Sequence, residues 1–289
     1  MTKIDLSKVD EIIRDVAASE VTPRFRKLAK GDVEMKGVND PVTIADKETE
    51  RLLTERLMAY LPGSMVVGEE SFAGDKGIMK RLDSDQPVWI IDPIDGTRNF
   101  VDGKPEFAVM VGLVQGRKPI ASWIHDPISN DTIMAEQGGG VWLRGKKLKL
   151  AANDKSVPTV GLVGSRVKKM ISDPAVMPQS PDMPVIEIGS CAGFDYPRLF
   201  VGDVTFADAK TPRAGFLFYR HTNAWDHIPG MFLHQEAGGY SADWAGKPYD
   251  MDRARDGLLF AADKASWDHL RQLFQPLIQH VTKGSIWQW

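Results

Sequence analysis

The sequence has little cysteine and no long apolar run. Cys191 is the single cysteine among 289 residues, so an internal disulfide is excluded and a reducing compartment is indicated. The opening stretch, MTKIDLSKVDEIIRDV, lacks the apolar segment of a signal peptide. No uninterrupted apolar run approaches the ~20 residues that a transmembrane helix needs. We therefore expect a cytoplasmic protein with no membrane partner.

The sequence also lacks a strong charge of either sign. Its 36 basic and 39 acidic residues leave a net charge of -3, which gives no reason to expect a nucleic-acid partner. At 43% hydrophobic residues, the chain can bury a sizeable core. Its length fits one large domain or two intimate ones.

The first part of the chain carries helical signals. Apolar residues at helical spacing predict a helix over residues 9–16, which Pro23 ends or kinks. Residues 31–43 suggest a short hairpin or loop, and a second helix is predicted from about Thr43 to Tyr60. Strand-like segments follow before the apolar run that contains residues 89–100.

The pattern changes twice further along. Residues 107–150 read as an antiparallel meander of short strands separated by turns. After Asn153, residues 159–166 and 184–193 read as buried strands, and residues 223–239 as a helix ended by two glycines. An apolar stripe runs over residues 267–281 despite Pro276. We predict a layered α/β sandwich, with an N-terminal α+β half over residues 1–152 and a C-terminal α/β half over residues 153–289.

Acidic residues recur where the pattern places the edge of an element. They lie in four stretches: DPVTIAD (Asp40, Asp46), GEES (Glu69, Glu70), DPIDGT (Asp92, Asp95) and AWDH (Asp226). Strand ends and helix starts meet at the ligand crevice of an α/β fold, and carboxylates gathered there need cations. Because no Cys pair or His-x-x-x-His spacing accompanies them, we expect oxygen ligands and Mg²⁺ or Mn²⁺. Two such ions about 3.5–4 Å apart suit in-line phosphoryl displacement.

The DGT segment supplies a complementary phosphate site. If a helix or turn begins at Gly96, the backbone N–H groups of Gly96 and Thr97 lie at its positive end. The Thr97 hydroxyl could orient a water molecule, and Asp46 could accept the proton of that hydroxyl.

Each of these residues also has a plainer interpretation. A single acid at a helix start is most often a cap, and GEES alone is most often a solvated loop. Cys191 is expected to be a small buried residue, and His125 a hydrogen-bonded turn residue. What argues against capping alone is the joint occurrence of all four acidic stretches.

Together these stretches resemble the inositol monophosphatase family, within the wider superfamily of Mg²⁺-dependent, lithium-sensitive phosphatases. WIIDPIDGTRNF resembles its first signature and WDHIPGMFLHQEAGG its second, while DPVTIAD and GEES resemble two upstream motifs. The motifs occur in the right order, and the resemblance runs from the first helix to beyond Gly239. It implies an αβαβα sandwich of the inositol monophosphatase and fructose-1,6-bisphosphatase type, and a homodimer, which is common in the family.

The resemblance also implies roles by position. The implied catalytic residues are Thr97, Asp46 and Glu69. The implied metal ligands are Glu69, Asp92, the backbone carbonyl of Ile94, Asp95 and Asp226, holding two Mg²⁺ ions and, at Glu69, a weakly bound third. The implied phosphate and substrate contacts are Gly96, Thr97, Asp95 and Asp226.

One departure from the family pattern bears on the substrate. The glutamate that contacts inositol in the family lies seven residues before the aspartate of the second signature, and here that position is Tyr219. The stretch around it is longer than in typical relatives and carries cations: Lys210, Arg213, Arg220 and His221. A carboxylate accepts hydrogen bonds from vicinal hydroxyls, whereas Arg and Lys only donate and favour anions. We therefore expect a broad specificity or a preference for an anionic leaving group.

The expected function is that of a Mg²⁺-dependent phosphomonoesterase, in which water attacks phosphorus in line. Its substrate would be an inositol monophosphate or a related small phosphorylated polyol. A sister activity is the nearest alternative: histidinol phosphate, fructose 1,6-bisphosphate or 3'-phosphoadenosine 5'-phosphate hydrolysis. A non-catalytic regulatory protein on the same fold is the other alternative, although a binding module needs no residue that activates water.

Overall fold

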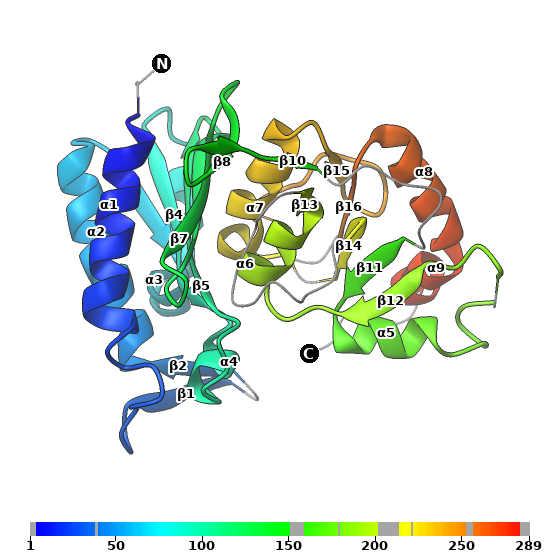
Figure 1. The fold of residues 1–289 in the computed structure, drawn as a ribbon, viewed down its shortest axis with the longest axis horizontal. Helices are drawn as coiled ribbons and strands as arrows, with labels where there is room; N and C mark the ends of the chain where they lie inside the picture. The colour runs from blue at the N-terminus through cyan, green and yellow to red at the C-terminus, as the bar shows by residue number, and fades with distance from the viewer. Residues whose placement is uncertain are drawn as a thin grey trace.

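The computed structural model describes residues 4–37, 40–150, 159–178, 180–201, 214–220, 222–252 and 257–283. Across Figure 1, helices, a sheet, helices, a second sheet and further helices follow one another as layers. This arrangement is an αβαβα sandwich, so the predicted fold class is confirmed. The predicted boundary between residues 152 and 153 lies outside the described residues and stays a prediction.

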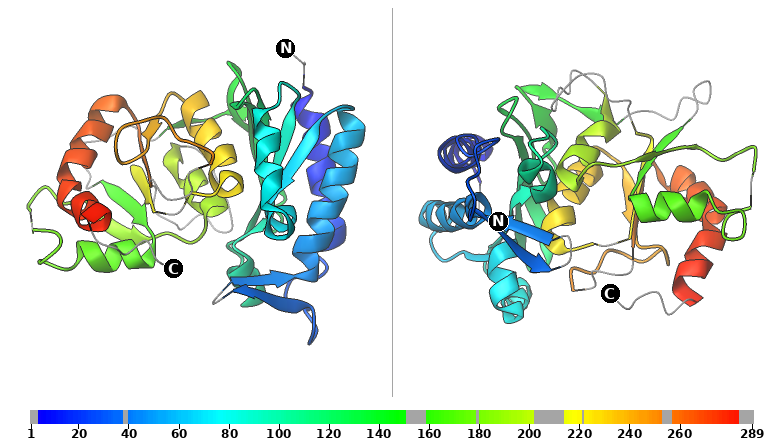
Figure 2. Two further views of the ribbon diagram at one scale, coloured as in Figure 1. Left: turned by 180° about the vertical axis from the view of Figure 1, so that it is seen from behind. Right: turned by 90° about the horizontal axis from the view of Figure 1, so that it is seen from below.

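The first helical layer consists of α1 (Leu6–Val16) and α2 (Ile44–Tyr60), which lie side by side in Figures 1 and 2. A single turn of π-helix, η1 (Ala17–Val21), extends α1 and ends just before Pro23. Thr43 caps α2, because its side chain accepts hydrogen bonds from the backbone N–H groups of Ala45 and Asp46. Both predicted helices are therefore present. The predicted hairpin before α2 is formed by β1 (Val33–Gly37) and β2 (Asp40–Thr43).

The first large sheet has seven described strands in the order β3-β4-β5-β6-β7-β8-β9. Their bounds are β3 (Met65–Gly68), β4 (Val88–Asp95), β5 (Ala108–Gln115), β6 (Lys118–Asp126), β7 (Asp131–Glu136), β8 (Gly140–Leu143) and β9 (Lys146–Lys147). From β4 onward every pairing is antiparallel, as the meander predicted, while β3 runs parallel to β4. Three short helices connect these strands: α3 (Glu69–Gly74), η2 (Lys76–Asp83) and α4 (Thr97–Val101).

The second large sheet has five described strands in the order β12-β11-β14-β16-β15. Their bounds are β11 (Val160–Val163), β12 (Val185–Ile188), β14 (Phe216–Tyr219), β15 (Tyr240–Ala242) and β16 (Leu258–Ala261). Helices α6 (Ala192–Asp195), η3 (Tyr196–Leu199) and α7 (Ala224–Glu236) lie between the two sheets, and α5 (Ser165–Ile171), α8 (Lys264–Leu273) and α9 (Gln275–Lys283) cover the outer face (Figure 1). A small ladder of β10 (Lys149–Leu150) and β13 (Phe200–Val201) connects the halves.

Two sequence interpretations need correction. Strand β12 lies at the edge of the sheet among the described strands, and its side chains are not fully covered: Val185 is 47% and Ile188 54% exposed. His125 lies inside β6 rather than in a turn; it bonds the Thr132 hydroxyl at 3.0 Å, and burial lowers its pKa to about 4. The predicted C-terminal apolar stripe is present, because its residues pack together in one core. It is carried by α8 and α9, and Pro276 is the second residue of α9.

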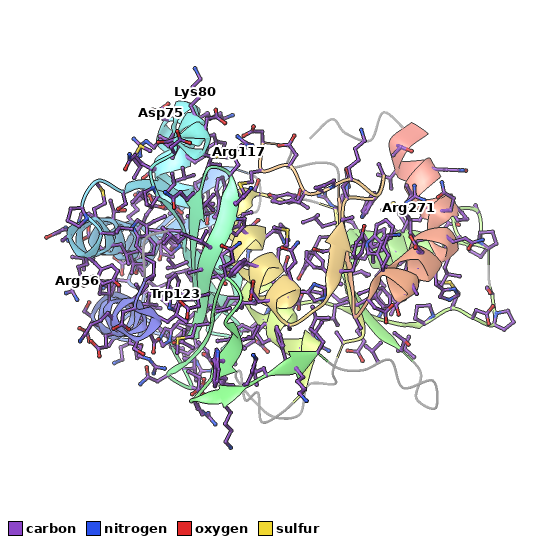
Figure 3. The ribbon with its side chains drawn as sticks, turned by 90° about the horizontal axis from the view of Figure 1, so that it is seen from above. Arg56, Asp75, Lys80, Arg117, Trp123 and Arg271 are labelled. Carbon is purple, nitrogen blue, oxygen red and sulfur yellow. The ribbon has the colours of Figure 1, made fainter. Side chains whose placement is uncertain are left out.

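Separate apolar cores join the layers. Trp123 fills the space between the first helices and the first sheet, where Figure 3 shows it pointing toward the helices, and its indole N–H donates to the Leu6 carbonyl at 3.0 Å. Ile228 and Phe260 belong to the core between the two sheets, and Phe274 to the core under the outer helices. Arg271 of α8 ties this outer layer back by donating to the Trp244 carbonyl at 2.9 Å (Figure 3). Across the described residues, no helix combines the length and apolarity needed to cross a membrane.

The close contact between α7 and Tyr196 predicts a sharp size limit at Gly230. A Cβ atom added to Gly230 would lie 2.0 Å from Cδ2 of Tyr196, whose ring is fully buried. We expect Gly230→Ala to lower the free energy of unfolding in urea by about 1–3 kcal/mol. Gly74→Ala is the matched control, because a Cβ atom there meets nothing within 4 Å. Equal stabilities for the two variants would contradict the described packing of α7.

Candidate functional site

An irregularity in β4 brings two of the predicted acids to the same side of the sheet. Residues three apart in a regular strand point to opposite faces. The register of β4 against β5 shifts between Asp92 and Asp95. Ile94 accordingly packs with Ile91 in the core under α1 and α2, while Ile90 faces the other core. The shift turns Asp95 to the side of Asp92, facing the middle helical layer.

Asp92, Asp95 and Asp226 form a compact acidic cluster on this face of the sheet. Each offers a carboxylate oxygen, and these oxygens lie within 4.8 Å of one another. Asp92 is buried and its Oδ1 has no hydrogen-bond partner, whereas Asp95 and Asp226 are partly exposed. Burial, followed by repulsion from Glu69, Asp95 and Asp226, raises the pKa of Asp92 well above its usual value. An orphaned buried oxygen beside two further carboxylates is the donor set that a hard divalent cation requires.

Asp226 reaches the cluster from the start of α7, in the C-terminal half. The Nδ2 group of Asn223, the N-cap residue, donates to Asp226 Oδ2 at 3.1 Å and fixes its orientation. Burial and repulsion from Asp95 raise the pKa of Asp226 as well. The helix continues through Pro229, so this proline does not displace Asp226.

Glu69 is the first residue of α3 and is paired with a lysine that the sequence interpretation missed. Lys36 Nζ lies 2.7 Å from Glu69 Oε1 and 3.0 Å from Glu70 Oε1. Burial alone lowers the pKa of Lys36, but its pairing with these two acids outweighs burial and raises it. Lys36 comes from β1, more than thirty residues away in the sequence, so no local pattern links it to the acids.

Thr97 and Asp46 make the contact that the sequence predicted. The Thr97 hydroxyl lies 3.0 Å from Asp46 Oδ1 and 2.9 Å from the Ile94 carbonyl oxygen. Gly96 before it has φ 86°, a left-handed conformation that favours glycine, and a Cβ there would lie 2.9 Å from the Glu106 carbonyl. The DGT turn therefore depends on glycine for both its conformation and its packing.

Asp46 is a buried carboxyl group held by hydrogen bonds from Thr43. It is fully buried, and Oδ2 accepts hydrogen bonds from the Thr43 backbone at 2.8 Å and the Thr43 hydroxyl at 2.6 Å. Burial raises the pKa of Asp46 to about 7 although the bonds from Thr43 oppose the shift. Asp46 thus serves both as a helix cap partner and as the partner of Thr97, so the capping interpretation and the functional one are compatible.

Helix α6 approaches the cluster from the C-terminal half. The backbone N–H of Gly193 donates to Asp95 Oδ2, and a Cβ on Gly193 would lie 2.5 Å from the Cβ of Ala108. Cys191 is partly buried beside this contact; burial and then the charge of Asp95 raise its pKa well above the usual value. Cys191 was expected to be a small buried residue; it is partly buried and packs against the core, and its position next to Asp95 was not predicted.

Tyr219, which is expected to replace the family's glutamate, contacts the carboxyl group of Asp195. Its hydroxyl donates to Asp195 Oδ2 at 3.1 Å, and Asp195 Oδ1 accepts from the Ser190 backbone at 2.9 Å. Burial raises the pKa of Asp195 to about 7. Tyr219 also borders a cavity of about 290 Å³, whose other lining residues are Gly164, Ser165, Arg166, Val167 and Arg220. The other cations noted in this stretch, Lys210, Arg213 and His221, lie outside the described residues.

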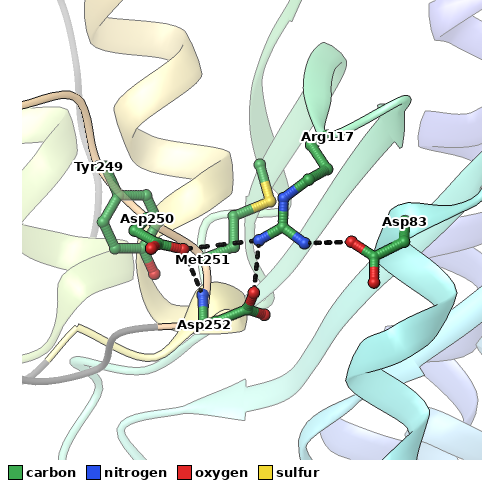
Figure 4. A pocket seen from close by; sticks show the side chains of 6 residues that line it. All are labelled: Asp83, Arg117, Tyr249, Asp250, Met251 and Asp252. Atoms are coloured by element: carbon green, nitrogen blue, oxygen red, sulfur yellow. Dashed lines mark hydrogen bonds and ion pairs between the residues drawn. The ribbon is translucent and has the colours of Figure 1, made fainter.

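A second cavity, of about 510 Å³, is lined by a clamp of ion pairs centred on Arg117 (Figure 4). Arg117 lies 2.6 Å from Asp83 of the N-terminal half, and 3.5 and 2.8 Å from Asp250 and Asp252 of the C-terminal half. The neighbouring Tyr249 donates its hydroxyl to the Thr222 carbonyl at 2.7 Å, just before α7 begins. The clamp thus holds the segment that supports the start of α7.

Comparisons with known proteins agree with the geometry. The sequence profile of the inositol monophosphatase family matches residues 5–281. A "Fructose-1,6-bisphosphatase/inositol-1-monophosphatase" of Thermotoga maritima is 30% identical over 217 residues, 75% of this chain and 77% of the relative. A "Nus factor SuhB" of Haemophilus influenzae is 30% identical over 247 residues, 85% of this chain and 86% of the relative. A solved IMPase structure from Thermotoga maritima has a TM-score of 0.76 at 24% identity, covering 96% of this chain and 98% of that one.

The acidic cluster predicts a pH-dependent response to metal. The raised pKa values of Asp92, Asp95 and Asp226 mean that their contribution to stability is present at acid pH and is lost as pH rises through the folded-state pKa. Mg²⁺ should therefore raise the Tm of the protein more at about pH 8 than at about pH 5, because protonated carboxyl groups bind it poorly.

Asp92→Asn tests the same cluster by removing its central charge. We expect a higher Tm without metal, since repulsion is relieved, and no further rise with Mg²⁺. Asp83→Asn is the control; its exposed carboxylate belongs to the Arg117 clamp, and we expect a near-native Tm and a full Mg²⁺ response. A normal Mg²⁺ response in Asp92→Asn would contradict the metal assignment. Thermal unfolding with and without Mg²⁺ makes both measurements.

Proposed function

This chain belongs to the inositol monophosphatase family, and from that premise we propose that it is a Mg²⁺-dependent phosphomonoesterase acting on a small phosphorylated polyol. The observation that carries the proposal is the Thr97 hydroxyl, held 3.0 Å from Asp46 beside the cluster of Asp92, Asp95 and Asp226. A hydroxyl with a buried proton acceptor next to a cation site is the arrangement needed to activate water.

The residues that would hold the ions are those implied by the resemblance. They are Glu69, Asp92, the Ile94 carbonyl, Asp95 and Asp226, with Mn²⁺ as an alternative metal. When bound, the divalent ions would lower the pKa of the attacking water, polarise the phosphoryl group and stabilise the leaving alkoxide. Lys36 lies 2.7 Å from Glu69 Oε1, so a cation bound by Glu69 would compete with this ion pair.

The chain's own groups would move the proton. The Thr97 hydroxyl has one proton and two acceptors within reach, Asp46 Oδ1 and the Ile94 carbonyl oxygen. With the Ile94 carbonyl engaged by a cation, the hydroxyl would donate to Asp46, and its oxygen could accept a hydrogen bond from water. As water attacks phosphorus, its proton passes to Thr97 while the Thr97 proton passes to Asp46, whose pKa of about 7 suits a base near neutral pH. The Gly96 and Thr97 amides would hold the phosphate. The ester P–O bond breaks as the new P–O bond forms. The leaving alkoxide takes a proton from solvent water to give the alcohol, and Asp46 returns its proton to solvent.

A regulatory role without catalysis is the second candidate, since one relative is named a Nus factor. The hydrogen bond between Thr97 and Asp46 favours the enzyme, because a binding module has no need for a residue that activates water. Release of inorganic phosphate from an ester panel in the presence of Mg²⁺ separates the two. Absence of turnover on every ester, with metal bound, would leave the regulatory role.

The substrate proposal concerns the leaving group. The Tyr219 hydroxyl is engaged with Asp195, and the cavity beside it is lined by Arg166 and Arg220. Guanidinium groups favour phosphate and carboxylate over neutral hydroxyls. We therefore propose that the enzyme accepts polyol phosphates carrying a second anionic group, in addition to inositol monophosphates. The homodimer and the cytoplasmic location remain proposals from the resemblance and the sequence.

Removal of the Thr97 hydroxyl should abolish most of the activity. We expect Thr97→Val to lower kcat by ~10²–10⁴-fold, the usual contribution of general base catalysis. The Mg²⁺ concentration for half-maximal rate should change by less than about threefold, which corresponds to under ~1 kcal/mol of binding free energy. The reason is that the Thr97 side chain is not among the implied metal ligands. Thr97→Ser keeps the hydroxyl and is the control, expected to retain most of kcat. If Thr97→Val instead lost stability and kept its activity, Thr97 would be only a structural residue of the turn.

The leaving-group proposal predicts a measurable preference. The values of kcat/KM for fructose 1,6-bisphosphate and inositol 1-phosphate should lie within about 100-fold of each other, or favour the bisphosphate, at fixed salt and Mg²⁺. Arg166→Gln should lower kcat/KM for the bisphosphate more than for inositol 1-phosphate, because Arg166 lines the cavity. A preference for inositol 1-phosphate above ~100-fold over all other esters, about 2.7 kcal/mol, would refute it.

A further inference from the structure

Helix α2 carries a second buried acid one turn after Asp46. Glu50 is only 4% exposed, and its carboxylate faces the first turn of α3. Its Oε2 accepts a hydrogen bond from the Glu70 backbone at 2.7 Å, and its Oε1 accepts one from the Ser71 backbone at 2.8 Å and another from the Ser71 hydroxyl. Three donors of α3 thus bind one carboxylate. Glu50 is neither a member of the acidic cluster nor the proton acceptor of Thr97, which is Asp46.

This contact replaces the cap that α3 lacks. The residue before the helix is Gly68, which has no side chain to cap the first N–H groups. A Cβ atom on Gly68 would lie 2.3 Å from Cδ of Glu50, so glycine leaves the space that the carboxylate fills. A helix of six residues has little stability of its own, and its position must come from tertiary contacts.

The position of α3 matters because Glu69 is its first residue. Gly68 at the end of β3 is the register partner of Ile91 in the parallel strand β4, so Glu69 and Asp92 follow directly after paired positions. The backbone that carries Glu69 is held by Glu50 through the next two residues. Helix α2 also contacts Thr97 through Asp46. The same helix therefore positions both Thr97 and the start of α3.

We propose that Glu50 is a positioning residue, whose hydrogen bonds to the first turn of α3 hold Glu69 in place to bind a divalent cation. The assignment rests on the proposed function, in which Glu69 is a metal ligand. Lys36 binds the side chains of Glu69 and Glu70 from the other side. Loss of the Glu50 contact leaves Lys36 as the main tether, and Lys36 draws Glu69 toward itself rather than toward a metal ion.

Glu50→Gln is the direct test, because it keeps the shape and replaces one acceptor oxygen with an NH₂ group that faces a donor. We expect Mn²⁺ binding, followed by electron paramagnetic resonance, and Mg²⁺ binding, followed by calorimetry, to weaken at least about tenfold, or ~1.4 kcal/mol. The value of kcat at saturating Mg²⁺ should stay within about threefold of wild type, since the Thr97 proton path is untouched. Glu55→Gln makes the same chemical change at an exposed position of α2 and should bind both metals normally.

Gly68→Ala disturbs the same contact from the other side without changing any charge. The added Cβ would push against the Glu50 carboxylate, and we expect the same loss of metal affinity. It also keeps the test decisive if Glu50→Gln fails to fold. Ser71→Ala removes one of the three donors and should give a smaller loss.

Three results would contradict one of the two proposals. A lower Tm for Glu50→Gln and Gly68→Ala, with metal binding equal to that of Glu55→Gln, would make Glu50 a structural residue and overturn the proposal. A wild-type protein that binds no Mn²⁺ would overturn it too. A wild-type protein that binds metal but hydrolyses no ester would refute the proposed function alone, because the metal-binding comparison would still stand.

Discussion

Mutual repulsion among closely spaced carboxylates is the constraint on which the site depends. Asp92, Asp95 and Asp226 present oxygens within 4.8 Å of one another, and Asp92 Oδ1 has no partner within the described structure. Such a cluster is costly near neutral pH unless a cation neutralises it. The surrounding fold is built to keep the acids there: β4 is irregular to turn Asp95, α7 begins where Asp226 is needed, and the Gly193 N–H of α6 steadies Asp95.

The parts of the fold that rest on local signals could be predicted from the sequence. The apolar residues between about Thr43 and Tyr60 predicted α2, and the short β-prone runs predicted the meander of the first sheet. The exposure of β12 could not be predicted, because an apolar run does not tell an edge strand from a central one. The same limit hid the break between α8 and α9, where Pro276 fits the start of a new helix as well as a kink.

In the candidate site, too, some contacts could be predicted from sequence motifs and others could not. The contact of Thr97 with Asp46 was predicted from motifs, although these residues are 51 positions apart. Lys36 and Glu50 were missed because neither has a distinctive neighbourhood, and each meets its partners only through the folded arrangement of β1, α2 and α3. Tyr219 was recognised as a departure, but its partner Asp195 was not, since nothing in the sequence pairs a strand residue with the end of a short helix.

Anomalous diffraction from crystals soaked in Mn²⁺ would show whether the carboxylates form a metal centre. We expect anomalous peaks among Asp92, Asp95 and Asp226, with Glu69 contacting the bound metal as well as Lys36. Peaks only elsewhere on the surface, or a cluster without any peak at saturating Mn²⁺, would contradict the claim that these carboxylates form a metal centre.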